Sequence, residues 1–140
     1  VLIVDDESHV RLLLKMLIKT LPCEVVGEGT NGAEVLPLYR SLKPDLMLLD
    51  EPLQHLDLRH QQQTMRQIRA ATQAGRAAVV VLHDLAFAAQ CDRVLLLYGD
   101  GSHAQGAAAD MLEPKRLEGL FGCRLAVCGS GATAHVTPVI

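Results

Sequence analysis

The sequence predicts an α/β fold, a three-layer sandwich of helices around a mainly parallel sheet. Two observations carry this prediction. Short, wholly apolar runs recur along the chain, which is typical of strands buried on both faces. Between them lie segments with apolar residues at helical spacing. The loops are short, and strands that alternate with helices in this way favour a parallel sheet.

The first half of the chain predicts strand, helix, strand, helix and strand. These elements are expected at residues 1–4, 7–20, 24–27, 33–42 and 45–50. Pro22 ends the first helix, since proline cannot continue one. Asn31 is the expected N-cap of the second helix, and Lys43-Pro44 closes it.

The second half continues this alternation. Helices are expected at 59–74, 84–90, 107–112 and 114–120, strands at 77–82, 93–98 and 102–105, and a hairpin at 124–128 and 135–140. Asp84 is the expected cap of the short helix. The hairpin would turn around Gly129-Ser130-Gly131.

Composition excludes several classes of protein. The 140 residues carry a formal net charge of −3 and form no basic stripe, so we expect no nucleic-acid or membrane partner. No apolar run reaches the length of about 18 residues that spans a bilayer. The four cysteines form no Cys-x-x-Cys pair, which favours reduced thiols in a cytoplasmic protein.

The two parts of the chain differ in composition. Residues 1–50 contain one Ala and no Gln, whereas residues 51–140 contain fifteen Ala and eight Gln. Such a change is typical of a chain joined from two sources; the alternative is chance combined with a helix-rich second half.

Three carboxylates follow predicted strands: Asp5, Asp6 and Asp50. Ligands of parallel α/β sheets bind beyond the carboxyl ends of the strands. If the first and third strands are neighbours, these side chains converge, and a divalent cation would relieve their repulsion. Mg²⁺ prefers such oxygen ligands, so Mg²⁺ is the cofactor that this cluster could bind, and we expect no cofactor to be required.

The segments VLIVDDE, VVGEGTNGAEVL and KPDLMLLD resemble the first half of a response-regulator receiver domain, over residues 1–50. The resemblance implies that Asp5 and Asp6 hold Mg²⁺ and that Asp50 accepts a phosphoryl group from a histidine kinase. The later residues depart from the family pattern. His83 and Asp84 replace the Ser or Thr after the fourth strand, and no Lys follows the fifth strand.

A second resemblance begins in the same strand. LMLLDEPLQHLDLRHQQQT and AVVVLHDLAFAAQCDRVLLLYGDGSHAQG resemble the Walker B segment, D-loop and switch-histidine strand of an ABC-transporter ATPase of the haem and iron-chelate importer type, over residues 47–140. The resemblance implies that Asp50 orients Mg²⁺, Glu51 polarises the attacking water and His83 senses the γ-phosphate. Asp57 would belong to the D-loop, and the partner would be a transporter permease.

The two resemblances together imply one domain over residues 1–140 whose parts join within the strand 46–50. They imply a flavodoxin-like sheet of order 2-1-3-4-5, with an antiparallel extension near 102–105. The functional residues of neither family are complete in this sequence. No lysine follows a glycine, so the phosphate loop Gly-x-x-x-x-Gly-Lys-Ser/Thr is missing from the sequence, as is the LSGGQ signature. We therefore expect no nucleotide-binding residues.

Three interpretations follow. The first is an artificial fusion of two α/β folds with no selected activity, no enzyme function and no partner, in which Asp50, Glu51 and His83 are vestigial. The second is a weakly Mg²⁺-binding, phosphorylatable receiver remnant with metal ligands Asp5, Asp6 and Asp50. The third, an ABC-type nucleotide hydrolase, is disfavoured by the missing phosphate loop. Neither the histidine kinase nor the permease is expected to bind.

Overall fold

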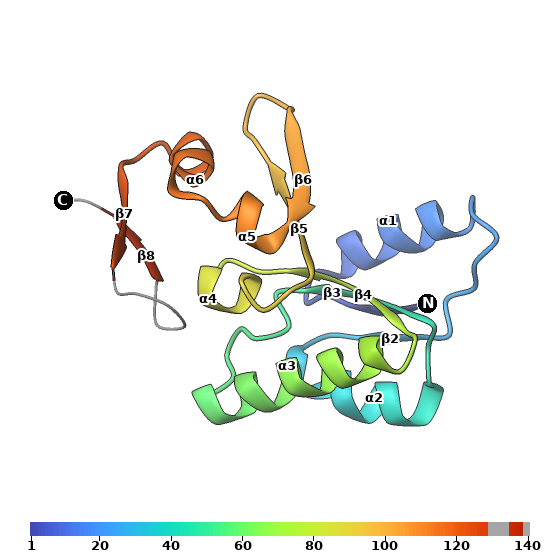
Figure 1. Cartoon of the computed structure of the whole chain (residues 1–140). Coiled ribbons are helices and arrows are strands. Elements are labelled where there is room, and N and C mark those ends of the chain that lie inside the picture. Colours follow the sequence, from blue (N-terminus) through green and yellow to red (C-terminus); the bar gives the residue numbers. More distant parts are fainter. Residues whose placement is uncertain (129–134, 139–140) are drawn as a thin grey trace. The chain divides into compact units, whose positions relative to one another are not determined.

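The computed structural model describes residues 1–128 and 135–138 (Figure 1). The chain divides into two compact units, Val1–Leu82 and His83–Ile140. Each unit has its own strands and its own buried residues.

The first unit is built on a four-stranded parallel sheet. Its strands are β1 (Leu2–Val4), β2 (Gly27–Gly29), β3 (Leu46–Asp50) and β4 (Ala77–Val81), in the order β2-β1-β3-β4. Helix α1 (Ser8–Ile18) lies on one face of the sheet, and α2 (Val35–Leu42) and α3 (Leu58–Gln73) lie on the other (Figure 1). A short 3₁₀ turn, η1 (Gly32–Glu34), precedes α2. This is the predicted three-layer α/β arrangement.

The core of the first unit lies around the two central strands. Every residue of β1 is at most 1% exposed, and Met47 and Leu49 of β3 are also buried. Helix α3 adds Met65, Ile68 and Ala71 at intervals of three residues, which places them on one helical face. A strand must be apolar throughout to be buried on both faces, and the apolar sequence of β1 meets that requirement.

Caps and one close backbone approach fix the loops of the first unit. Asn31 Oδ1 accepts from the backbone N–H of Ala33 at 3.0 Å, as the sequence predicts. Asp57 Oδ1 accepts from the N–H of His60 at 2.9 Å and so caps α3. Gly32 packs so closely against Pro52 that an added Cβ would lie 1.7 Å from the Pro52 carbonyl oxygen.

The second unit contains two antiparallel pairs. Strand β5 (Arg93–Leu97) pairs with β6 (His103–Ala107), and β7 (Leu125–Cys128) pairs with β8 (His135–Pro138). The helices of the unit are α4 (Leu85–Ala88), α5 (Ala108–Met111) and α6 (Pro114–Phe121). Leu96, Met111 and Leu117 form a small core. Asp84 caps α4 by accepting from the N–H of Ala86 at 2.7 Å, as predicted.

The structure confirms the α/β class, the parallel order 2-1-3-4, the antiparallel strand after the fifth strand and the C-terminal hairpin strands. The fifth strand differs from the prediction, because β5 pairs with β6 in a separate two-stranded sheet. The burial of β5 gives the physical reason. Leu96 is buried whereas Leu95 and Leu97 are exposed, so this strand is buried on one face only, as is common in antiparallel pairs. The turn at Gly99-Asp100-Gly101 brings β6 back along β5 and closes a short loop.

Two smaller outcomes concern single segments. The second strand lies at Gly27–Gly29, later than the predicted 24–27. The predicted turn of the C-terminal hairpin, Gly129-Ser130-Gly131, lies outside the described residues. The prediction of a single domain over residues 1–140 stays a prediction.

Candidate functional site

Asp5 and Asp50 lie at the same end of neighbouring strands. Val4 of β1 is in register with Leu49 of β3, and the strands are parallel. The next residue on each strand is therefore one of these aspartates, as the sequence predicts. Asp5 is 1% exposed, and its backbone N–H donates to the Gly29 carbonyl at 3.2 Å. The first three strands thus position its carboxylate.

The Asp5 carboxylate is only half satisfied. Its Oδ1 accepts a hydrogen bond from the backbone N–H of Glu7 at 2.7 Å. Its Oδ2 is the one buried side-chain oxygen or nitrogen in the described part of the chain that lacks a hydrogen-bond partner. A buried carboxylate oxygen without a donor is costly, so this atom favours either a cation or a shared proton.

The charge of Asp5 affects the pKa of the neighbouring Asp50 carboxyl group. The pKa of Asp50 is raised above its ordinary value, first by burial and then by the negative charges of Asp5 and Glu51. The pKa is raised further by the hydrogen bond that protonated Asp50 could donate to Asp5, and by the charge of Asp6. When Asp50 carries a proton, its hydroxyl can donate to Asp5, which satisfies the oxygen left alone when both groups are ionised. The two aspartates therefore form one electrostatic unit.

Asp6 and Glu51 surround this pair in different ways. Asp6 is exposed. Glu51 has a positive φ of 40°, a left-handed conformation that is uncommon for a residue with a side chain. Its backbone N–H donates to the Val81 carbonyl at 3.2 Å, and this bond extends the β3–β4 pairing past Asp50. The left-handed backbone is the point at which the chain leaves the strand.

Arg11 supports the loop after β1 and was missed by the sequence reasoning. Its Nη1 donates to the Asp5 carbonyl oxygen at 2.7 Å, and its Nε lies 3.6 Å from Glu28 Oε2. The side chain is 15% exposed. A signal was present, because Arg11 begins the second turn of a helix that starts directly after the acidic pair, within reach of the loop.

The carboxylates at this edge of the sheet offer a small donor set for Mg²⁺. Among the residues that the structure describes, no group of three or more His, Cys, Asp or Glu side chains is arranged to hold a metal ion. Mg²⁺ commonly takes only one or two protein carboxylates and completes its shell with water. Asp5 and Asp50, with the unsatisfied Oδ2 between them, fit that smaller requirement. The three-ligand set with Asp6 stays a prediction.

The residues assigned by the ATPase resemblance fall in different units. Asp50, Glu51 and Asp57 belong to the first unit, and His83 begins the second. Asp57 caps α3, and its Oδ2 lies 2.7 Å from His60 Nδ1. Hydrogen bonds from His60 lower the pKa of Asp57. This aspartate therefore has a structural role that needs no nucleotide.

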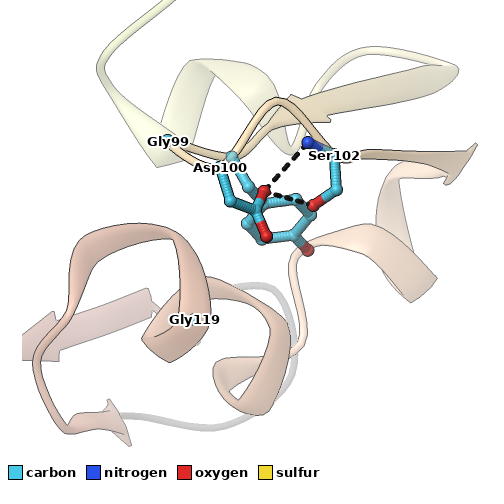
Figure 2. A pocket seen from close by; sticks show the side chains of 5 residues that line it. Gly99, Asp100, Ser102 and Gly119 are labelled. Carbon is cyan, nitrogen blue, oxygen red and sulfur yellow. Dashed lines mark hydrogen bonds between the residues drawn. The ribbon is translucent and has the colours of Figure 1, made fainter.

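A hollow in the second unit, of about 410 Å³, carries one carboxylate. Figure 2 shows Asp100 in the turn between β5 and β6, beside Ser102 and with Gly119 nearby. One oxygen, Asp100 Oδ1, accepts from Ser102 N at 2.9 Å and from Ser102 Oγ at 2.6 Å. These bonds lower the pKa of Asp100. They close a turn of the hairpin, so the carboxylate has a structural explanation.

Comparison with curated proteins gives partial matches to ATPases. The chain is 46% identical over 82 residues to the hemin import ATP-binding protein HmuV of Pseudomonas fluorescens Pf-5, covering 58% of this chain and 32% of that protein. It is 37% identical over 99 residues to HmuV of Rhizobium meliloti, covering 70% and 37%. The chain therefore spans about a third of the length of these relatives.

A solved structure supports the fold alone. A chain from a metal-chelate type ABC transporter in an inward-facing conformation superposes with a TM-score of 0.64 at 23% identity, covering 78% of this chain and 47% of that one. In the described ranges, no helix combines the length and apolar character needed to cross a membrane.

The response regulator receiver domain model matches residues 1–90, beyond the Asp50 at which the sequence resemblance was expected to end. A match of 90 residues and one of 82 cannot both fit within 140 residues without sharing a segment. One stretch of chain therefore satisfies both patterns. The receiver model covers more than half of the sequence and includes the acidic site. The chain belongs to the response regulator receiver domain family.

Proposed function

We propose that this chain is an artificial recombination of a receiver domain with the end of an ABC-transporter ATPase. The observation that carries the proposal is the overlap of the two similarities in a chain that spans only about a third of its ATPase relatives. Strand β3 supports it, because this central strand ends in Asp50, the residue that both patterns use. No activity was selected in the joined chain.

The chemistry left to the acidic site is weak binding of a divalent cation. The unsatisfied, buried Asp5 Oδ2 and the raised pKa of Asp50 support this second part of the proposal. Both indicate excess negative charge that a cation would neutralise. Asp5 and Asp50 would supply the protein oxygens, Asp6 would add charge from the surface, and water would complete the shell. The bound ion would supply charge neutralisation at this edge.

Phosphorylation of Asp50 would be slow. Addition of a phosphoryl group places a dianion beside Asp5 and Glu51, whose charges already oppose ionisation of Asp50. No lysine follows β5 to stabilise that charge. Nucleotide hydrolysis is disfavoured for a different reason: without a phosphate loop the sequence lacks the groups that hold and position phosphates.

The test is a thermal melt of the full chain with and without millimolar Mg²⁺, at constant ionic strength. A cation that binds only the folded state stabilises it by mass action, by about 2.7 kcal/mol at roughly 100 times its dissociation constant. We expect stabilisation of the wild type and none of Asp50→Asn. The matched control is Asp45→Asn, at the opposite end of the same strand. Its ion pair with Arg76 is lost, but its Mg²⁺ response should equal that of the wild type.

Two results would contradict the proposal in separate ways. An equal Mg²⁺ response in wild type and Asp50→Asn would show that Asp50 does not take part in a cation site. Micromolar ATP binding that is lost in Glu51→Gln would contradict the statement that the joined chain has lost the ATPase chemistry.

A further inference from the structure

A groove of about 290 Å³ lies between α2 and α3 of the first unit. It contains none of the acidic residues discussed above. Its larger apolar lining residues are Leu36, Pro37 and Leu56, which come from α2 and from the loop before α3. Concave sites that bind small molecules commonly combine such an apolar lining with a few polar groups.

The polar side chains of the groove carry donors without protein partners. Arg40 on α2 and Gln63 on α3 line it, and among the described residues neither side chain forms an ion pair or hydrogen bond. Thr64 also lines the groove and is 3% exposed. The donors that the groove offers to a ligand are therefore those of the exposed Arg40 and Gln63 side chains.

The histidine of the groove is held in a fixed orientation. His60 lines it, and its Nδ1 lies 2.7 Å from Asp57 Oδ2. Asp57 also caps the helix on which His60 sits, through the backbone N–H at 2.9 Å. This double contact ties the imidazole to the start of α3 and leaves Nε2 for a ligand. A preorganised side chain loses less freedom on binding.

The charge balance favours an anion. The carboxylates near the groove are already engaged: Asp57 accepts from His60, and Glu34 accepts from Thr30 and Asn31. Arg40 therefore contributes positive charge that no described carboxylate pairs with. A guanidinium binds a carboxylate through two parallel hydrogen bonds, and the Gln63 amide can add another donor.

We propose that the α2–α3 groove binds a small amphipathic carboxylate, with its carboxylate on Arg40 and Gln63 and its apolar body on Leu36, Pro37 and Leu56. The volume lies at the lower limit of ligand pockets, which suits an acid with a single ring rather than a nucleotide. A ligand of this size binds with a dissociation constant on the order of 1 mM.

The experiment is an NMR titration of the full, ¹⁵N-labelled chain with 3-phenylpropionate. We expect saturable shifts of backbone amides at residues 32–40 and 56–64. The neutral amide of the same acid, 3-phenylpropionamide, should bind about tenfold more weakly, because a charge-assisted hydrogen bond is lost. Arg40→Gln should weaken 3-phenylpropionate binding by a similar factor and leave binding of the amide nearly unchanged.

The matched control is Arg69→Gln, an exposed arginine of α3 outside the groove. It removes the same charge and should leave the affinity for 3-phenylpropionate unchanged. The proposal is overturned if the acid and its amide bind equally, or if Arg69→Gln weakens binding as much as Arg40→Gln does. Shifts that do not saturate, or that spread over the whole first unit, also overturn it.

Discussion

The two units differ in how far apart in the sequence their paired strands lie. In the first unit, β1 pairs with β2 and β3 pairs with β4, each across an intervening helix. β1 also pairs with β3, across α1, β2 and α2. In the second unit, β5 pairs with β6 across a five-residue turn, from Tyr98 to Ser102. The first unit buries the whole of strand β1, whereas the second unit has the small buried cluster Leu96, Met111 and Leu117.

Because of this difference, the two units depend to different extents on contacts between distant parts of the sequence. A parallel sheet needs apolar strands from several parts of the chain, so its stability depends on packing between distant segments. A two-stranded hairpin forms from neighbouring residues but is at best marginally stable alone. We therefore expect the first unit to be the more resistant to unfolding, and the variants below test that expectation.

The largest effect is expected for Leu49→Ala in β3. Leu49 is 2% exposed at the centre of the sheet, and truncation of a buried leucine leaves a cavity that costs about 2–5 kcal/mol. Urea unfolding, followed by backbone hydrogen exchange in β1, β3 and β4, measures the loss. The control is Leu12→Ala on α1, where the side chain is 55% exposed and little change is expected. Similar losses in both variants would contradict the assignment of the core.

Leu117→Ala should separate the two units. Leu117 is fully buried in the core of the second unit, so the same truncation should lower hydrogen-exchange protection in β5, β6 and α6. We expect amides of β1 and β3 to keep their protection, because their buried neighbours belong to the first unit. Loss of protection in both units to the same extent would show a single cooperative domain over 1–140, as the sequence predicts.

Gly32→Ala tests how tightly the loops of the first unit are packed. The new Cβ would lie 1.7 Å from the Pro52 carbonyl oxygen, and one of the two loops must move. Overpacking of this kind costs about 1–3 kcal/mol. Gly99→Ala in the second unit is the control, since a Cβ there meets open space. If Gly32→Ala is neutral, the close approach of the two loops is not retained in solution.

The smallest effect is a difference in pH dependence between the carboxylates of the two units. Asp50 has a raised pKa, so the folded state keeps its proton where the unfolded chain, with a value near 3.8, has lost it. Stability from this group therefore falls as pH rises from about 3.8 through the raised pKa. Asp50→Asn should remove that fall and make the protein more stable at neutral pH without metal.

Asp100 should behave in the opposite way. Its pKa is lowered by Ser102, so its contribution is present above the unfolded value and is lost as pH falls through the folded pKa. Asp100→Asn keeps an acceptor for Ser102 but removes the charge, and should slightly reduce stability at neutral pH. Unfolding free energies of both variants between about pH 3 and 7 measure these slopes. Equal slopes in the two variants would contradict the assigned shifts.

The sequence could predict those features that depend on local pattern. The apolar run that forms β1, the caps Asn31 and Asp84, and the helical spacing of α3 were all correctly predicted. The convergence of Asp5 and Asp50 followed from strand adjacency, a consequence of parallel order. In each case the order of residue types along the chain was sufficient for the prediction.

Other features depend on which segments meet, and the sequence did not reveal them. The separation of β5 from the parallel sheet was missed because the apolar run Arg93–Leu97 has the same composition as a buried parallel strand. In the structure Leu95 and Leu97 are exposed and Leu96 is buried, which is the alternation of a one-sided sheet. The groove between α2 and α3 was also missed, because it is lined by residues that only helix packing brings together.

The burial pattern of β3 has a consequence for how α/β proteins exchange fragments. Its side chains alternate, with Met47 and Leu49 the most deeply buried. A crossover shifted by one residue within this strand would send both toward the opposite face and move Asp50 away from Asp5, because strand side chains have a period of two. Exchange of segments between such folds is therefore restricted to junctions that keep strand parity. A shared apolar strand that ends in an aspartate is a natural place for such a junction.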